Sequence, residues 1–308
     1  MLYHVRKKFK AYSDLLRLHF FFVWPTLFCA GLFLGFTFHG GFNPVLIIQA
    51  VFIAFLGFEA GLILNDINDA NLDKKELPTE KKLTHYWRPF GSRPLPSNQI
   101  FLRHAKVLFV LLAALTSVII FTLPYPHSIY VFTIMVTCYC LEVFYQIKKR
   151  KQKTPIAQII GRIDFALFLA AGYLCVGLPD LPFLLLFFFF YPLALAHLGV
   201  NDLVDVVNDQ AKAMKTPATL YGIKATVYWI LLFSTLHFIA TGIFLYILGS
   251  SLMLFGFMIG MLLVIIGNFV ILKNRSSASG IRALPFFHLS MLIYAITIIT
   301  NYIVIAFL

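Results

Sequence analysis

The stretch "VLIIQAVFIAFLGFEAGLILNDINDANLD", residues 45–73, decides the fold class of this chain. Its first twenty residues are mostly apolar and carry a single charge, that of Glu59. About twenty such residues are enough for an α-helix to cross the hydrocarbon core of a bilayer. The last nine, residues 65–73, hold three aspartates and three asparagines. The sequence therefore predicts a membrane-spanning helix that ends in an acidic motif.

The composition of the chain is that of a membrane protein. Of its 308 residues, 60% are hydrophobic and 12% are charged, whereas a soluble domain has about 25% charged residues. The four cysteines lie inside apolar stretches, where we expect them to pack as small apolar side chains rather than to form disulfides or bind a metal. They are Cys29, Cys138, Cys140 and Cys175.

Nine apolar runs are long enough to cross about 30 Å of hydrocarbon as helices. Backbone groups in lipid must be hydrogen-bonded within the protein, so these runs predict helices rather than the strands of an open sheet. The expected fold is therefore all-α, a polytopic membrane protein with nine transmembrane helices. The runs lie near residues 15–38, 45–65, 100–122, 127–147, 157–178, 181–201, 225–248, 251–272 and 284–307.

Basic residues are expected on only one side of this bundle. The first, third, fifth and seventh connections are short and contain no Lys or Arg. The N-terminal segment, the other connections and the adjoining helix ends hold all 25 basic residues. Because basic loops stay in the cytoplasm, the sequence predicts a cytoplasmic N-terminus and a C-terminus outside. The net charge of +12 then faces lipid head groups or an anionic substrate, not nucleic acid.

A second acidic motif, "NDLVDVVND" at residues 201–209, repeats the pattern of residues 65–73. Each motif follows a helix that is expected to run from the outside to the inside. Both motifs are therefore predicted at the cytoplasmic edge of the membrane. Their matching positions indicate an internal duplication, with halves of about 1–150 and 151–308 within one domain of residues 1–308.

Each motif places four polar side chains on one face if its helix continues through it. At 100° per residue, the four positions span about 100°. Crowded carboxylates raise one another's pKa values unless a cation lies between them. Oxygen ligands of this kind select Mg²⁺ or Ca²⁺, and Mg²⁺ completes its shell with water and substrate phosphate. The two sets are Asn65, Asp66, Asp69 and Asp73, and Asn201, Asp202, Asp205 and Asp209.

Basic loops surround the predicted acidic sites. The longest connection, residues 74–99, could cover them as a lid, and the next basic connection reads "YQIKKRKQK", residues 145–153. A third supplies Lys212 and Lys215. Acidic and basic groups at one mouth are expected if a diphosphate binds between them, with Mg²⁺ bridging carboxylate to phosphate and Lys and Arg binding the other oxygens. The alternative for each single Lys is an anchor to lipid head groups.

Two alternatives for the acidic motifs stay open. A lone Asp near a helix end is usually a solvated or capping residue, but the repetition at matching positions argues against this for the pair. Intramembrane carboxylates can also line an ion path, so a cation-coupled transporter is the second hypothesis. Transporter sites usually lie at the midplane of the membrane, whereas these motifs are predicted at its edge, where an anionic head group enters.

Together these residues resemble the UbiA superfamily of intramembrane prenyltransferases. Residues 65–73 match that family's first motif, N-D-x-x-D-x-x-x-D, at every fixed position, and residues 201–209 match the second, D-x-x-D-x-x-x-D. "SRPLPSNQ", residues 92–99, is similar to the family's R-P-L-P-S-G, with Asn98 in place of Gly. "FYQIKKR", residues 144–150, resembles the end of the family's fourth helix.

The resemblance implies nine helices around a lipid-filled central cavity. It also implies transfer of a prenyl group from a prenyl diphosphate, such as geranylgeranyl diphosphate, to an acceptor. Two Mg²⁺ ions, bound directly or through water, are the implied cofactors. The residues that would hold them are Asn65, Asp69, Asp73, Asp202, Asp205 and Asp209, with Asp66 in support.

The resemblance also implies a set of residues around the diphosphate. Arg93, Lys149, Arg150 and Lys215 would bind its oxygens, with Arg88 and Lys148 behind them. Tyr145 would donate a hydrogen bond to it, and Tyr139 would lie beside the first carbons of the prenyl chain. The residues expected to act in the chemical step are Asp69, Asp205, Lys149 and Tyr145.

The acceptor is left open by the sequence. Relatives prenylate hydroxybenzoate or dihydroxynaphthoate in quinone biosynthesis, glyceryl-phosphate ethers in lipid biosynthesis, haem, chlorophyllide or homogentisate, and no residue selects among these acceptors. The prenyl length is open as well, and a relative that only binds or hydrolyses the diphosphate is a third hypothesis. The charged residues with open roles, at the acceptor or in structural ion pairs, are Arg17, His19, Glu59, Glu142 and Asp164.

Overall fold

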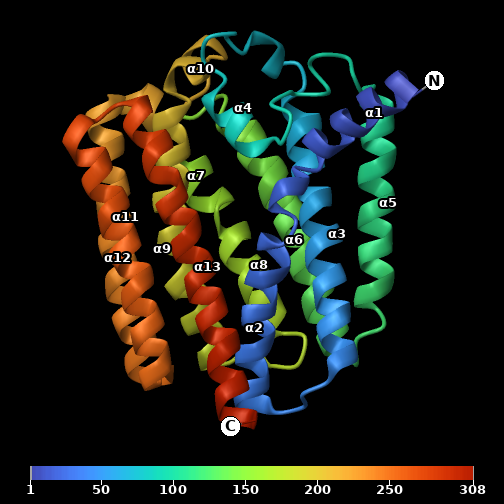
Figure 1. Cartoon of the computed structure of the whole chain (residues 1–308), viewed down its shortest axis with the longest axis vertical. Helices are drawn as coiled ribbons and strands as arrows, with labels where there is room; N and C mark the ends of the chain where they lie inside the picture. Colours follow the sequence, from blue (N-terminus) through green and yellow to red (C-terminus); the bar gives the residue numbers. More distant parts are fainter. Residues whose placement is uncertain (1, 308) are drawn as a thin grey trace.

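Long apolar helices make up most of the computed structural model, which describes residues 2–307 and their side chains from residue 6 onward. Within this part of the chain, nine helical segments are long and apolar enough to cross a membrane, as the sequence predicts, and there is no strand. Figure 1 shows them side by side in one bundle. They are η1 (Leu18–Phe20) with α2 (Val23–His39), α3 (Pro44–Asp69), α5 (Leu102–Ile120), α6 (His127–Lys148), α7 (Ile156–Gly161) with α8 (Ile163–Tyr173), α9 (Leu181–Val204), α11 (Pro217–Leu248), α12 (Ser251–Asn274) and α13 (Ser277–Phe307).

The outward faces of these helices are apolar. On α5, for example, the exposed side chains include Val107, Val110, Leu111, Leu115 and Val118, and each is at least 49% accessible. Their spacing of three and four residues places them on one face of the helix. An apolar face of this length is stable in hydrocarbon and not in water, which agrees with a protein embedded in the membrane.

Four shorter elements lie at one end of the bundle or lead into it. They are α1 (Leu2–Leu15), η2 (Asp73–Lys75), α4 (Lys82–Trp87) and α10 (Val206–Ala211). Figure 1 shows α1, α4 and α10 at the same end, with the C-terminus at the opposite end. The α4 helix lies within the long connection of residues 74–99, so the predicted lid has a helical turn at its centre.

Two spans are less regular than the sequence predicts. The run of residues 157–178 forms not one helix but two, α7 and α8, which are separated at Arg162, and α8 ends at Tyr173. The seventh span begins at Pro217, ahead of the expected residue 225, and it is kinked at Gly222, where φ is 81°. Proline fits the first turn of a helix, and glycine adopts positive φ without steric cost.

The inner helices pack closely around α8. The α2, α6 and α9 helices all contact it, while α11 packs on α9 and α12 packs on α13. The backbones of α2 and α8 touch at two glycines. A Cβ atom on Gly31 would lie 2.1 Å from the carbonyl oxygen of Leu169, and one on Gly172 would lie 1.8 Å from that of Phe28. Small residues allow this approach between membrane helices.

Candidate active site

A cavity of about 300 Å³ lies between six of the spans, α2, α3, α5, α6, α8 and α9. Its inner wall is apolar and includes Phe28, Phe58, Ile134 and Phe168. Polar residues line the end that lies under the lid, where Leu83 and Trp87 of α4 also contribute. The cavity can therefore hold a molecule with a long apolar tail and a charged head.

The first acidic motif reaches this cavity from two elements rather than one. The α3 helix ends at Asp69, so it does not continue through the motif, and Asp73 lies on η2. Asn65 and Asp69 are four residues apart on α3 and share a face. Together with Asp73 they line the cavity, whereas Asp66 does not.

The second motif is also broken. The α9 helix ends at Val204, Asp205 lies at the break with φ −95° and ψ 10°, and Asp209 lies on α10. Asp205 and Asp209 line the same cavity as the first motif. Asp202 lines a smaller adjoining pocket of about 140 Å³, which Asp205 and Asp209 also line. The motifs from the two halves of the chain thus meet at one cavity mouth.

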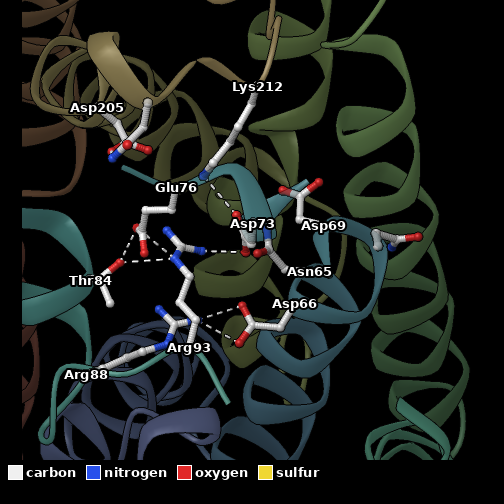
Figure 2. Close-up of polar contacts among 12 residues, drawn as sticks. Asn65, Asp66, Asp69, Asp73, Glu76, Thr84, Arg88, Arg93, Asp205 and Lys212 are labelled. Atoms are coloured by element: carbon white, nitrogen blue, oxygen red, sulfur yellow. Dashed lines mark hydrogen bonds and ion pairs between the residues drawn. The ribbon is translucent and has the colours of Figure 1, made fainter. Parts of the chain in front are cut away.

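Cations neutralise the first motif. Lys149 and Arg150 donate to Asp69 at 2.9 and 3.2 Å. Asp73 accepts from Arg93 at 2.6 Å and from Lys212 at 2.8 Å (Figure 2). Burial alone would raise the pKa of the Asp73 carboxyl, but these two cations outweigh it and hold the pKa at about 2. Asp73 is therefore ionised, and both aspartates of this motif that line the cavity are paired with cations.

The second motif has no such partners. Among the described residues, no Lys, Arg or His forms an ion pair with Asp202, Asp205 or Asp209. Burial raises the pKa of the Asp205 carboxyl, and burial together with the Asp205 carboxylate raises the pKa of Asp209 to about 7. The Oδ2 atom of Asp202 is buried without a hydrogen-bond donor. Buried carboxylates in this state favour a proton or a bound cation.

The asparagine that begins each motif is held by its amide nitrogen. Asn65 Nδ2 donates to Glu142 at 2.7 Å, and Asn201 Nδ2 donates to the carbonyl oxygen of His197 at 3.1 Å. Asn201 Oδ1 is buried without a donor. Glu142 also accepts from Arg162 at 2.8 Å. These contacts give Glu142 a structural role that its sequence position did not reveal.

The donor atoms around the mouth suit Mg²⁺, because they are carboxylate and amide oxygens. As the side chains stand, however, no group of three His, Cys, Asp or Glu residues within residues 2–307 is close enough to hold an ion. The ion pairs of Asp69 and Asp73 explain part of this. A metal bound to Asp69 or Asp73 would compete with the lysine and the arginine that pair with each of these carboxylates.

Most of the predicted diphosphate residues lie at the same mouth. Arg88, Arg93, Lys149 and the two tyrosines line the cavity. The Lys149 Nζ atom lies 4.7 Å from the centre of the Tyr145 ring. Tyr139 donates to the carbonyl oxygen of Gly57 at 3.0 Å, so its hydroxyl is already engaged.

Three predicted diphosphate residues lie elsewhere. Arg150 reaches Asp69 from outside the cavity. Lys148 and Lys215 are exposed and line neither pocket. Lys215 instead donates its backbone N–H to the carbonyl oxygen of Lys149 at 2.7 Å.

Lys212 lines the cavity, although Lys215 was the residue of this connection that the resemblance implied at the diphosphate. It lies in the same connection as Lys215, is 6% accessible and reaches Asp73. A short helix after Asp205 would have placed Lys212 one turn from Asp209 and on the same face. The sequence thus indicates the position of Lys212 only if residues 206–211 are recognised as a short helix.

The departure of this chain from the R-P-L-P-S-G pattern has a conformational explanation. Asn98 replaces the glycine and has φ 55°, in the left-handed region. Glycine enters this region freely, and Asn tolerates it better than most other residues. The substitution thus preserves the turn that follows Arg93.

Comparisons with known proteins agree with this fold. The profile described as the UbiA prenyltransferase family matches residues 22–292. The digeranylgeranylglyceryl phosphate synthase of Sulfurisphaera tokodaii is 27% identical over 226 residues, which are 70% of this chain and 72% of that protein. The apo structure of a UbiA homolog from Aeropyrum pernix K1 has a TM-score of 0.72 at 15% identity, over 94% of this chain and 98% of the other. A UbiA homolog from Archaeoglobus fulgidus bound to GPP and Mg²⁺ has a TM-score of 0.66 at 14% identity, over 94% and 99% of the two chains.

Proposed function

The chain belongs to the UbiA prenyltransferase family, and on that basis we propose that it transfers a prenyl group from a prenyl diphosphate to a glyceryl-phosphate acceptor with Mg²⁺ as cofactor. The observation that carries this proposal is the meeting of two acidic motifs, from distant parts of the chain, at the mouth of one apolar cavity. The cavity offers room for the prenyl chain, and the mouth offers charges of both signs for the diphosphate.

The acidic residues would hold the cofactor. In the proposal, Asn65, Asp69 and Asp73 bind from one side and Asp202, Asp205 and Asp209 from the other, and we propose two ions. Mg²⁺, when bound, supplies positive charge that stabilises the diphosphate as it leaves. The homolog bound to GPP and Mg²⁺ supports this choice of cofactor.

The basic residues would bind the diphosphate. Lys149, Arg93 and Lys212 are paired with Asp69 or Asp73 in this structure. If those carboxylates held a cofactor ion, the three cations would be free to donate to diphosphate oxygens. Their positive charge then stabilises the negative charge that builds up as the carbon–oxygen bond breaks.

The cavity wall would protect the reacting carbon. The bond between the allylic carbon and the diphosphate breaks, and its electron pair leaves with the diphosphate. Aromatic faces such as that of Tyr145 stabilise positive charge on the carbon, while apolar residues such as Phe58 and Phe168 exclude water. The acceptor hydroxyl oxygen then forms the new bond, and its proton passes to the departed diphosphate.

The proposed class of acceptor rests on the name of the related Sulfurisphaera protein. The Sulfurisphaera protein is named as a digeranylgeranylglyceryl phosphate synthase, and this favours a glyceryl-phosphate acceptor and a geranylgeranyl donor over an aromatic acid. A transporter is not favoured, because the family is one of prenyltransferases. A protein that only binds or hydrolyses the diphosphate would form no prenylated product.

We also propose that the site faces the cytoplasm. The end of the bundle that carries α1, α4 and α10 is the end with the basic connections, and such connections remain inside. The proposed single domain contains both halves, because each half supplies one acidic motif to the same cavity.

Reconstitution in lipid vesicles tests the proposed function. Purified protein is supplied with Mg²⁺, radiolabelled geranylgeranyl diphosphate and either geranylgeranylglyceryl phosphate or a hydroxybenzoate. We expect a labelled ether lipid with the first acceptor, lost on chelation and in the Asp69→Ala, Asp205→Ala double variant. An aromatic product would overturn the acceptor class, and folded protein that forms no product with any donor length would overturn transferase activity.

A further inference from the structure

A chain of hydrogen bonds connects the lid to the second acidic motif. The hydroxyl of Tyr86, on α4 of the lid, lies 2.6 Å from His288 Nδ1 on α13. His288 Nε2 lies 2.7 Å from His197 Nε2 on α9. The same nitrogen of His197 lies 3.3 Å from the amide nitrogen of Asn201, the first residue of the second motif. Four side chains thus join three elements that are distant in the sequence.

The amide of Asn201 fixes the direction of these bonds. An amide nitrogen only donates, and in a neutral imidazole one nitrogen donates and the other accepts. His197 Nε2 therefore accepts and carries no proton. The proton of the 2.7 Å contact must then be on His288 Nε2. This leaves His288 Nδ1 as the acceptor for the Tyr86 hydroxyl, so the bonds from the lid donate toward His197.

Packing alone does not explain the two histidines. His197 is 6% accessible, and the aromatic neighbours of His288 include Trp87 at 4.9 Å and Phe20 at 5.9 Å between ring centres. Buried polar groups are costly unless they are hydrogen-bonded. An aromatic cluster needs no polar member to pack well, so the hydrogen bonds are the distinctive feature of this place.

Asn201 is the residue on which the chain of bonds acts. Its amide nitrogen also donates to the carbonyl oxygen of His197 at 3.1 Å, and its Oδ1 atom is buried without a donor. Asn201 lines both the cavity and the smaller pocket that Asp202, Asp205 and Asp209 line. The contacts that hold the amide nitrogen thus leave the amide oxygen as the free acceptor beside these carboxylates.

The lid end of the chain lies outside both pockets. Tyr86 and His288 line neither of them, whereas Trp87, the next residue of α4, lines the cavity. The backbone of Tyr86 is also held, because its carbonyl oxygen lies 3.0 Å from His19 Nε2. A displacement of α4 would therefore break the bond between Tyr86 and His288, and that bond connects the position of the lid to the second motif.

We propose that Tyr86 and His288 are positioning residues, which act through His197 to fix the amide of Asn201 while the lid covers the cavity. This rests on the proposed function, in which the second motif holds the cofactor. Removing a group that orients a metal-binding residue commonly lowers metal affinity by about 10- to 100-fold. Coupling between two sites is reciprocal, so ligands bound at the second motif also hold the lid in place.

Donor binding at varied Mg²⁺ concentration tests the connection. Protein in nanodiscs is titrated with Mg²⁺ at a fixed concentration of geranylgeranyl thiolodiphosphate. We expect Tyr86→Phe, which removes only the hydroxyl, to raise the Mg²⁺ concentration for half-maximal binding about threefold, and His288→Phe to raise it about tenfold. Tyr221→Phe is the matched control and should cause no shift. Its hydroxyl donates to the Lys153 carbonyl oxygen at 3.2 Å, and Tyr221 lines neither pocket.

The double variant separates a connected chain from two local effects. Because Tyr86 acts through His288, Tyr86→Phe should cause no additional shift in the His288→Phe background. Shifts that multiply would show that the two residues act independently, and this overturns the proposal. If His288→Phe does not fold, Tyr86→Phe alone decides, and an unchanged Mg²⁺ dependence in that variant overturns the proposal.

Hydrogen exchange of the lid gives a readout other than metal affinity. In the wild type, Mg²⁺ with geranylgeranyl thiolodiphosphate should slow amide exchange in residues 82–88, because the lid opens less often. At saturating ligand, the slowing should be smaller in Tyr86→Phe. A merely structural role of the hydroxyl would change exchange by the same factor with and without ligands. Equal slowing in the two proteins overturns the proposal.

The outcomes keep this proposal apart from the proposed function. Product formation by the wild type, with no shift in Tyr86→Phe, overturns the connection and leaves the transferase intact. The expected shifts in a protein that forms no product support the connection and overturn transferase activity. A wild-type lid whose exchange does not respond to Mg²⁺ and geranylgeranyl thiolodiphosphate overturns the connection.

Discussion

Lys149 Nζ lies 2.9 Å from Asp69 Oδ2, so a cation from the end of α6 occupies the first acidic motif. Lys212 does the same at Asp73, at 2.8 Å. The second motif has no comparable partner among the described residues, and its Asp205 and Asp209 carboxyls have raised pKa values. The cavity-lining carboxylates of the first motif are thus paired with cations, whereas burial favours protonation of Asp205 and Asp209.

Lys149 should matter for the donor rather than for the metal. In Lys149→Met we expect the Kd for geranylgeranyl thiolodiphosphate to rise about tenfold or more, because a charge-assisted hydrogen bond to the diphosphate is lost. Mg²⁺ affinity should not fall, because Asp69 loses a competing cation. Calorimetry with each ligand measures both. Lys151→Met, an exposed lysine two residues away, is the control, and weaker Mg²⁺ binding in Lys149→Met would contradict this role.

Glu142 should act through Asn65. Its carboxylate accepts from Asn65 Nδ2 at 2.7 Å, which directs the amide oxygen away from Glu142. In Glu142→Ala we expect the Mg²⁺ concentration needed for half-maximal donor binding to rise about tenfold, as is typical when a group that orients a metal ligand is removed.

The control for this prediction is Asp164→Asn. Asp164 lies 3.5 Å from Arg162 and shares that partner with Glu142. It has no contact with Asn65 among the described residues. If both variants shift the Mg²⁺ dependence equally, the effect comes from Arg162, and the role assigned to Asn65 is wrong.

Mg²⁺ should stabilise the folded protein through the second motif. A ligand present at 100 times its Kd stabilises by about 2.7 kcal/mol, so the Tm of the wild type should rise with Mg²⁺ and fall again on chelation. Asp205→Asn should lose this rise. Asp180→Ala, which removes the side-chain cap at the other end of α9, should lower the Tm and retain the Mg²⁺ response. A retained response in Asp205→Asn would contradict the proposed metal site.

Gly172 should be required for packing of α2 on α8. Its Cβ would lie 1.8 Å from the Phe28 carbonyl oxygen, whereas one on Gly242 would have no atom within 4 Å. We expect Gly172→Ala to destabilise the protein by about 1–3 kcal/mol, because the backbones must separate. Gly242→Ala should not destabilise it. Thermal unfolding in detergent compares the two, and equal Tm values would contradict the packing shown here.

The long helices could be predicted from the sequence because hydrocarbon imposes a simple rule on length and polarity. All nine predicted runs correspond to spans in the described chain. The helix ends could not be placed in the same way. The assumption of a continuous helix through residues 65–73 was wrong, because α3 ends at Asp69. Hydropathy does not register such a break, since polar residues occur on both sides of it.

The site could be predicted in part. The repeated motifs led to Asp69, Asp73, Asp205 and Asp209, which line the cavity. Between Lys212 and Lys215 the choice depended on the turn that ends α10, where Ala213 has φ 56°. Alanine rarely adopts the left-handed conformation, so its presence at position 213 does not predict this turn. The pairing of Asp66 with Arg88 depended on how the lid folds back over α3, and no local pattern encodes that contact.

A double-mutant cycle tests whether the two distant motifs form one site. Mg²⁺-dependent binding of geranylgeranyl thiolodiphosphate would be measured for wild type, Asp69→Asn, Asp205→Asn and the double variant in nanodiscs. We predict that the double variant binds no more weakly than the weaker single variant, because either change already disrupts the shared site. Independent losses that add in free energy would show that the motifs form two separate sites.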